Sequence, residues 1–190
     1  LISASGALNY QWGNGVQISN QYVSPTTIGN NSYIVTGSDV NSCSNSDTVN
    51  ILVNSLPIAQ VSASDTNICI NDTITLLSSA ASNYQWNNGS TSQSQTLILG
   101  NAGTTIFTVT IFDNNSCSAT DSVIVNVNNN PIISVSANNN NICIGESVTL
   151  SATGAINYLW DNGVTSSTQV ITPSTSAILT YSVVGTDINS

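Results

Sequence analysis

Lysine, arginine, histidine and methionine are all absent from this 190-residue sequence, and nine acidic residues give it a formal charge of −9. Nucleic acids and anionic membrane surfaces are bound through cationic side chains, so both classes of partner are excluded. Without histidine or lysine, the chain cannot build a Ser-His-Asp triad, a Cys-His pair or a Schiff base. We therefore expect that the protein is not an enzyme.

Long apolar runs are also missing. No stretch approaches the roughly 20 apolar residues that a membrane helix needs, and no charged segment followed by an apolar one marks a signal peptide. Hydrophobic residues still make up 40% of the chain, which is enough to form a core. With charged residues at only 5%, stability must come from apolar burial and backbone hydrogen bonds rather than from ion pairs.

A 74-residue repeat organises the whole sequence. Trp12, Trp86 and Trp160 are spaced 74 residues apart, and the same spacing relates Cys43 to Cys117 and Cys69 to Cys143. We number repeat 1 as residues 1–54, repeat 2 as 55–128 and repeat 3 as 129–190. Only repeat 2 is complete in this register, so we expect the native polypeptide to be longer and to contain further repeats.

Each repeat has the pattern of an all-β domain. Apolar and polar residues alternate over short segments, and turn-forming residues recur every 8 to 12 positions or so. Asn88-Gly89 and its counterparts follow the tryptophan and predict a tight hairpin turn. The fold class that we predict is a series of immunoglobulin-like (PKD-like) β-sandwich repeats. In repeat 2 the expected strands cover residues 58–63, 72–79, 83–86, 90–99, 104–112 and 118–127.

The aromatic residues are candidates for the core or for a sugar-binding surface. Each tryptophan lies two residues after a tyrosine, so both side chains point to the same face of a strand. Exposed aromatics would suit carbohydrate binding, whereas recurrence in every repeat favours a core position. We predict that the following residues form the core: Tyr10, Trp12, Tyr84, Trp86, Tyr158 and Trp160.

The carboxylates offer only a weak calcium site and no other cofactor is expected. Asp113 and Asp121 flank one predicted turn of repeat 2, and Asp39 and Asp47 flank its counterpart in repeat 1. Calcium takes six to eight oxygen ligands, usually several of them carboxylates. Two aspartates at a turn are too few unless another repeat adds ligands, so solvated turn residues are the default interpretation.

The four cysteines fall into two kinds of position. Cys69 and Cys143 precede the second predicted strand of their repeats, whereas Cys43 and Cys117 lie at the turn before the last strand. Paired positions of this kind indicate disulfides and an oxidising compartment. One alternative is a Cys69–Cys117 bond within repeat 2. The other, which we favour because the two positions belong to opposite ends of a sandwich, is a bond between neighbouring repeats.

Several segments resemble the Ig-like and PKD-like repeats of giant cell-surface adhesins of Bacteroidetes. The segments are ICIGESVTLSATGAINYLWDNG at residues 142–163, TYSVVGTD at 180–187, DNNSC at 113–117 and DSVIVNVNNNP at 121–131. The resemblance implies a secreted, extracellular protein that is exported by type IX secretion and linked to gliding motility or adhesion. It also implies O-glycosylation at Asp-Ser/Thr-aliphatic motifs, which here place sugars on Thr48, Thr73 and Ser122.

The expected function is structural. We predict a repeat region of a surface adhesin or filament that mediates attachment, with neighbouring repeats and further copies of the chain as partners in a homo-oligomeric filament. A multivalent module that binds glycans or other partners is the alternative, since many weak sites add avidity. A more distant alternative is that these are spacer repeats of a surface enzyme.

Overall fold

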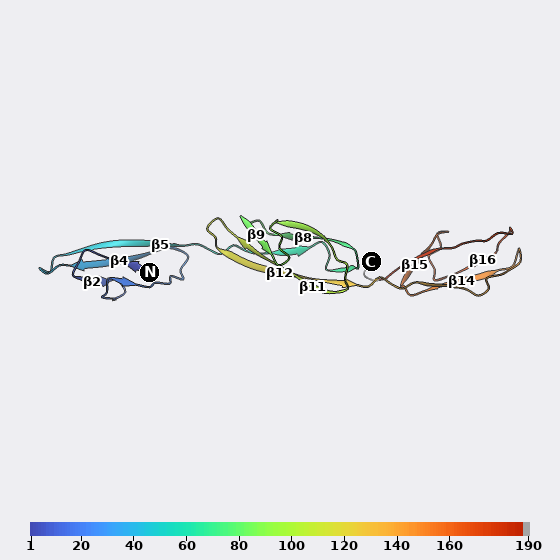
Figure 1. Ribbon diagram of the computed structural model, residues 1–190, viewed down its shortest axis with the longest axis horizontal. Helices are drawn as coiled ribbons and strands as arrows, with labels where there is room; N and C mark the ends of the chain where they lie inside the picture. Colours follow the sequence, from blue (N-terminus) through green and yellow to red (C-terminus); the bar gives the residue numbers. More distant parts are fainter. Residues whose placement is uncertain (188–190) are drawn as a thin grey trace. The chain divides into compact units, whose positions relative to one another are not determined.

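The computed structural model describes residues 1–187, and this part of the chain is all-β, with seventeen strands and no helix (Figure 1). Repeat 1 contains β1 (Ile2–Ser3), β2 (Asn9–Trp12), β3 (Asn20–Gln21), β4 (Gly29–Ser38) and β5 (Ser44–Val53). Repeat 2 contains β6 (Val61–Ala63), β7 (Asn67–Cys69), β8 (Thr73–Ser78), β9 (Asn83–Trp86), β10 (Ser94–Ile98), β11 (Gly103–Phe112) and β12 (Ser118–Asn128). Repeat 3 contains β13 (Ser134–Ala137), β14 (Val148–Thr153), β15 (Asn157–Trp160), β16 (Thr168–Ile171) and β17 (Val183–Thr186).

The described chain packs into two compact units. One unit holds Leu1–Ile58 and Ile111–Ala119, and the other holds Ala59–Thr110 and the described residues that follow Ala119. The boundaries of these units fall within repeat 2. Each repeat is therefore described by its own strands. Within residues 1–187 no helix has the length and apolar character that crossing a membrane requires.

Repeat 2 consists of two sheets with strand orders β10-β8-β6 and β7-β12-β11-β9. Alternate side chains of β8 and β12 point inward, and Ile74, Leu76 and Val125 are fully buried. The polar residues between them face outward, because successive side chains of a strand point to opposite faces. Two sheets that bury facing apolar sides are consistent with a β-sandwich.

One strand of repeat 2 was absent from the sequence prediction. Residues of β7 pair in parallel with the end of β12, in the register Asn67 with Asn126 and Cys69 with Asn128. The segment has only three residues, and its turn-rich surroundings hide any alternating pattern. The six strands that the sequence predicts in repeat 2 all occur, with boundaries shifted by a few residues.

The Asn-Gly turns differ from the predicted hairpins. Gly89 has a φ of 88° and its N–H donates to the carbonyl of Trp86 at 3.0 Å, whereas Asn88 keeps a negative φ. The strands on either side, β9 and β10, belong to different sheets. The prediction of a tight turn is right and the prediction of a hairpin is wrong, because the turn carries the chain from one sheet to the other.

Repeat 1 has strand orders β2-β4-β5 and β1-β3. Strands β4 and β5 pair over ten residues and lie side by side (Figure 1). The 74-residue register places the counterparts of β6 and β7 before Leu1, and β1 corresponds only to the last part of β8. Val49 on β5 is 40% exposed.

Repeat 3 has strand orders β13-β14-β16 and β15-β17. Its core consists of Val148, Leu150, Ala152 and Trp160, with Tyr158 and Tyr181 packed against it. The register places the counterpart of β12 after Ser190, so no such strand occurs among the described residues.

Candidate functional site: a tryptophan-floored groove in repeat 1

The three tryptophans occupy the same buried position in each repeat. Trp12, Trp86 and Trp160 are 2%, 2% and 1% exposed. Each indole Nε1–H donates to a backbone carbonyl six residues later, at 2.9, 2.8 and 2.9 Å. Burial with a satisfied N–H is typical of a core residue. It also removes these side chains from any exposed sugar-binding surface.

The tyrosines that precede the tryptophans are half-buried and close a local loop. The hydroxyl of Tyr84 accepts the N–H of Ala81 at 2.8 Å and donates to the carbonyl of the same residue at 3.2 Å. Tyr158 does the same with Ala155, at 3.0 and 2.8 Å, and the Tyr10 hydroxyl accepts the N–H of Ala7 at 3.0 Å. These hydrogen bonds fix the backbone just before each strand that contains a tryptophan.

A glutamine that the sequence analysis overlooked completes this arrangement in every repeat. The Nδ2–H of Asn88 donates to the Oε1 of Gln95 at 2.8 Å, and the same bond recurs 74 residues earlier and later, at 2.7 Å in both cases. The Nε2 groups of Gln21, Gln95 and Gln169 are buried with no hydrogen-bond acceptor among the described residues. The 74-residue spacing of these glutamines was the signal that could have identified them.

The carboxylates that were considered for calcium have backbone partners. Asp39 Oδ1 accepts the N–H groups of Asn41 and Cys43 at 2.8 and 2.9 Å, which caps the turn between β4 and β5. Asp113 makes the equivalent pair of bonds, also at 2.8 and 2.9 Å. No group of three or more potential metal ligands of the His, Cys, Asp and Glu types lies together within residues 1–187. Asp39 and Asp113 therefore stabilise the turns that contain them.

Asp121 and Asp47 have the same position in their repeats but different partners. Asp121 Oδ2 accepts the N–H of Val61, the first residue of β6, at 2.9 Å. Asp47 Oδ1 accepts the N–H of its neighbour Thr48, at 2.8 Å, and the side chain is exposed. The same position of the repeat therefore anchors β6 in repeat 2 and bonds to the next residue of its own strand in repeat 1.

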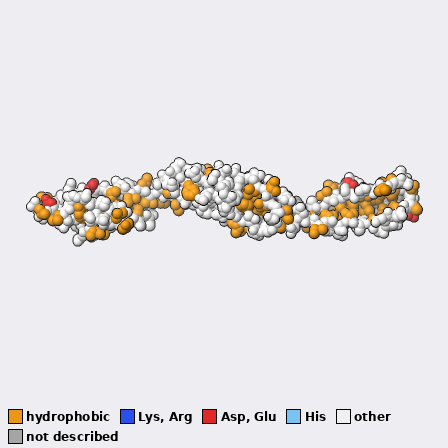
Figure 2. Space-filling model, viewed as in Figure 1, with side chains coloured by type: hydrophobic (Ala, Val, Ile, Leu, Met, Phe, Trp, Pro, Cys, Tyr) orange, Lys and Arg blue, Asp and Glu red, His pale blue; other side chains and the backbone are white. Residues whose placement is uncertain are grey.

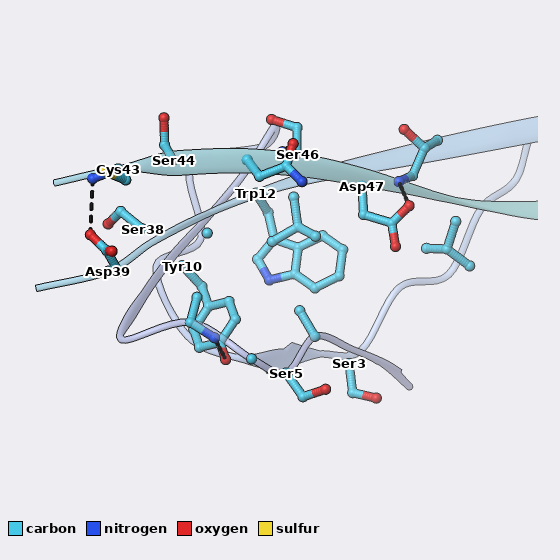
Figure 3. A pocket seen from close by; sticks show the side chains of 18 residues that line it. Ser3, Ser5, Tyr10, Trp12, Ser38, Asp39, Cys43, Ser44, Ser46 and Asp47 are labelled. Atoms are coloured by element: carbon cyan, nitrogen blue, oxygen red, sulfur yellow. Dashed lines mark hydrogen bonds between the residues drawn. The ribbon is translucent and has the colours of Figure 1, made fainter. Parts of the chain in front are cut away.

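Asp47 lines an open groove of about 530 Å³ in repeat 1 (Figure 3). Figure 3 shows the indole of Trp12 at its centre, Asp47 on the β5 side, and Ser3 and Ser5 on the opposite side. Tyr10, Asp39 and Cys43 also line it. The groove therefore brings together most of the residues that the sequence analysis selected in repeat 1. One wall is formed by the segment around β1 and the other carries the Asp47 carboxylate.

In repeat 2 the equivalent groove is filled by β6 and the residues before it. Ser79 N–H donates to the Gln60 carbonyl at 2.8 Å, and Gln60 N–H donates to Ser79 Oγ at 3.2 Å. Beyond them β6 pairs with β8, in the register Val61 with Ser78 and Ala63 with Leu76. The counterparts of Ser79 and Asp121 in repeat 1 are Ser5 and Asp47, so the anchoring residues are the same in both grooves.

No disulfide joins two cysteines within residues 1–187. Cys69 lies opposite Asn128, the last residue of β12, in the parallel ladder. Cys117 immediately precedes Ser118, the first residue of β12. An eleven-residue strand covers about 35 Å, far beyond the roughly 7 Å that a disulfide allows between Cα atoms. The Cys69–Cys117 alternative is therefore wrong. Burial raises the pKa of the Cys69 thiol, and the carboxylates of Asp187 and Asp72 raise it further.

The three hydroxyls proposed as sugar acceptors, those of Thr48, Thr73 and Ser122, lie on exposed residues. Comparison with known proteins adds no identity to these observations, since no family model and no curated protein matches the sequence. The assignment of a function therefore depends on the repeats themselves.

Proposed function

We propose that the chain is a structural repeat region of a large extracellular adhesin or filament, in which Ig-like sandwiches extend the molecule from the cell and mediate attachment. The observation that carries the proposal is that the interior of the repeats is kept while their surface changes. Such repeats contact mainly their neighbours and serve as units of length.

The kept interior is the set of tryptophan, tyrosine, asparagine and glutamine contacts described above. Some exposed positions do not follow the same rule. Tyr22, Thr96 and Val170 share one position of the repeat, and Tyr22 and Val170 are 86% and 66% exposed. A multivalent binding module needs the same contact residues in every unit for its avidity. The changing surface therefore favours the structural function over the binding module.

The surface is also polar without being charged. On the face shown in Figure 2, uncharged polar and backbone atoms predominate and carboxylates are few. On the outer side of the β11–β12 ribbon, hydroxyls and amides bond across the strands, as in Thr110 with Thr120 at 3.0 Å and Thr104 with Asn126 at 2.9 Å. Low charge reduces the repulsion between chains that come close together. Sugars on Thr48, Thr73 and Ser122, which the resemblance suggests, would add a solvated layer outside the cell.

The proposal is tested by chain length. Recombinant chains of three, six and nine 74-residue units should increase their maximum dimension in small-angle scattering by a constant amount per unit, and the native material should show extended structures in electron micrographs. A matched series in which each Trp86 equivalent is replaced by alanine should lose the regular increment, because the domains unfold. Compact particles of all three lengths, or glycan binding whose strength grows with the number of units, would contradict the proposal.

A further inference from the structure

We propose that the Asn-Gly pair in the turn after each buried tryptophan is a latent site of spontaneous covalent modification, and that the hydrogen bond from its asparagine to the buried glutamine keeps it intact in the folded repeat. The pairs are Asn14-Gly15, Asn88-Gly89 and Asn162-Gly163. All of these residues are exposed, so water and hydroxide reach them. The inference goes beyond the proposed function and holds or fails independently of it.

The modification is the loss of ammonia from asparagine, one of the thermolabile residue types. The backbone nitrogen of the glycine gives up its proton and attacks Cγ of the asparagine, so that an N–Cγ bond forms and the Cγ–Nδ2 bond breaks. Nδ2 takes up a proton and leaves as ammonia, and a cyclic succinimide remains. Water then opens the ring at either carbonyl and gives aspartate or isoaspartate, with no oxidation or reduction. Glycine favours the attack because no Cβ shields its nitrogen.

Three hydrogen bonds in repeat 2 hold the groups that this reaction has to move. The Nδ2–H of Asn88, which belongs to the leaving group, donates to Gln95 Oε1 at 2.8 Å. Asn88 Oδ1 accepts the N–H of Ser90 at 3.2 Å. The N–H of Gly89, the attacking group, donates to the carbonyl of Trp86 at 3.0 Å. The carboxamide is therefore held at both ends, and Cγ cannot turn toward the glycine nitrogen until these bonds break.

The same three bonds recur in the other two repeats. In repeat 1 Asn14 donates to Gln21 at 2.7 Å, and its Oδ1 accepts the N–H of Val16 at 3.3 Å. In repeat 3 the corresponding distances, to Gln169 and from Val164, are also 2.7 and 3.3 Å. The glycine N–H donates to the tryptophan carbonyl in both repeats, at 2.8 and 2.9 Å. The arrangement therefore accompanies the Asn-Gly pair wherever the pair occurs.

Stability alone does not account for the glutamine. Gln21 and Gln169 are only 9% and 8% exposed, and their Nε2 groups, like that of Gln95, are buried without an acceptor among the described residues. A buried donor without a partner lowers the stability of the fold, and an apolar side chain would avoid that loss. An apolar side chain cannot accept the N–H of the asparagine, however. The glutamine oxygen is thus the part of the side chain that the turn uses.

The experiment follows the reaction at each site in the whole 190-residue chain. Wild type and Gln95→Leu are kept folded at mildly alkaline pH, digested with pepsin at low pH, and analysed for aspartate and isoaspartate by tandem mass spectrometry. We expect the rate at Asn88 to rise between about twofold and tenfold in Gln95→Leu, the factor that the net free energy of one hydrogen bond gives. The rates at Asn14 and Asn162 should stay unchanged. A peptide of residues 83–92, NYQWNNGSTS, should react faster than any of the three folded sites.

The matched variant Gln169→Leu should move the effect to Asn162 and leave Asn88 unchanged. An unchanged rate at the affected asparagine in both variants overturns the proposal. An equal rise at all three sites also overturns it, because the protection would then come from global stability rather than from the hydrogen bond. Folded wild-type sites that react as fast as the peptide are the third contrary result. None of these outcomes alters the length test above, so the proposed structural function is judged separately.

Discussion

Strand β8 of repeat 2 and its counterpart β14 in repeat 3 have nearly the same sequence pattern but different burial. Ile74 and Leu76 are both 0% exposed, while Val148 and Leu150 at the equivalent positions are 8% and 9% exposed. The difference extends to the opposite sheet, where β11 has ten residues and β17 only four. Residues 177–182, the counterparts of the first part of β11, form no strand.

In repeat 2 the sheet that contains β11 also contains β12, whereas the 74-residue register places the counterpart of β12 after Ser190. Strand β12 lies beside β11 and provides the backbone partners that keep it extended. Its own side chains Val125 and Val127 are buried, at 0% and 4% exposed. The tighter burial of β8 in repeat 2 thus accompanies the presence of β12 beside β11.

The largest effect is expected where the repeats do not differ. Replacement of Trp86 by alanine should reduce the free energy of unfolding of repeat 2 by about 3–5 kcal/mol, because a fully buried side chain leaves a cavity. Trp160→Ala should cost repeat 3 a similar amount, since both indoles are buried and hydrogen-bonded alike. Hydrogen exchange resolved by repeat is the measurement. A loss below about 1 kcal/mol in either variant would contradict the shared core position.

A matched pair of leucines breaks the comparison directly. Leu76→Ala and Leu150→Ala remove the same side chain at the same register position, and costs for such changes range over about 2–5 kcal/mol. We expect Leu76→Ala near the top of that range and Leu150→Ala near the bottom, because Leu150 already contacts solvent. The same hydrogen-exchange measurement distinguishes them. Equal losses would show that β12 does not determine the packing of this strand.

Cys69 makes repeat 2 sensitive to alkaline pH. The pKa of the Cys69 thiol is raised in the folded state. The thiol of the unfolded chain therefore ionises first, as the pH rises above the ordinary pKa of a cysteine, about 8.5. Stability is therefore fully present below that value and should fall toward the raised folded pKa, by at most about 1.4 kcal/mol per pH unit. Chemical denaturation between pH 7 and pH 10 or so checks this, with Cys69→Ser as the control that removes the slope. An unchanged slope in Cys69→Ser would assign it to other groups.

The smallest effect is expected at the glutamine. Gln95→Leu should change the stability of repeat 2 by less than about 1 kcal/mol, since it removes a buried amide whose Nε2 has no acceptor, while the exposed Asn88 can bond to water. Gln95→Ala is the matched control, which also removes the amide but leaves a cavity and should cost more. Denaturant titration of both variants is sufficient. A loss above about 2 kcal/mol in Gln95→Leu would mean that the amide binds an unseen partner.

Much of the fold follows from local patterns. Alternation predicted six of the seven strand regions of repeat 2, since a half-buried strand requires it. The spacing of Trp12, Trp86 and Trp160 predicted one equivalent position, and all three are buried. The parallel strand β7 was missed because three residues in a turn-rich segment carry no period. The Asn-Gly turn was assigned to a hairpin because a turn signal does not say whether the flanking strands share a sheet.

The sequence by itself determined the all-β character, the 74-residue unit and the absence of cationic chemistry, because these depend on composition and on periods of a few residues. Only the tertiary structure decided which residues meet across long separations. It separated Cys69 from Cys117 along β12, made Asp121 an anchor for β6, and left Asp47 beside an open groove. Those outcomes depend on strand pairing between residues up to 60 positions apart, and no local pattern encodes such a pairing.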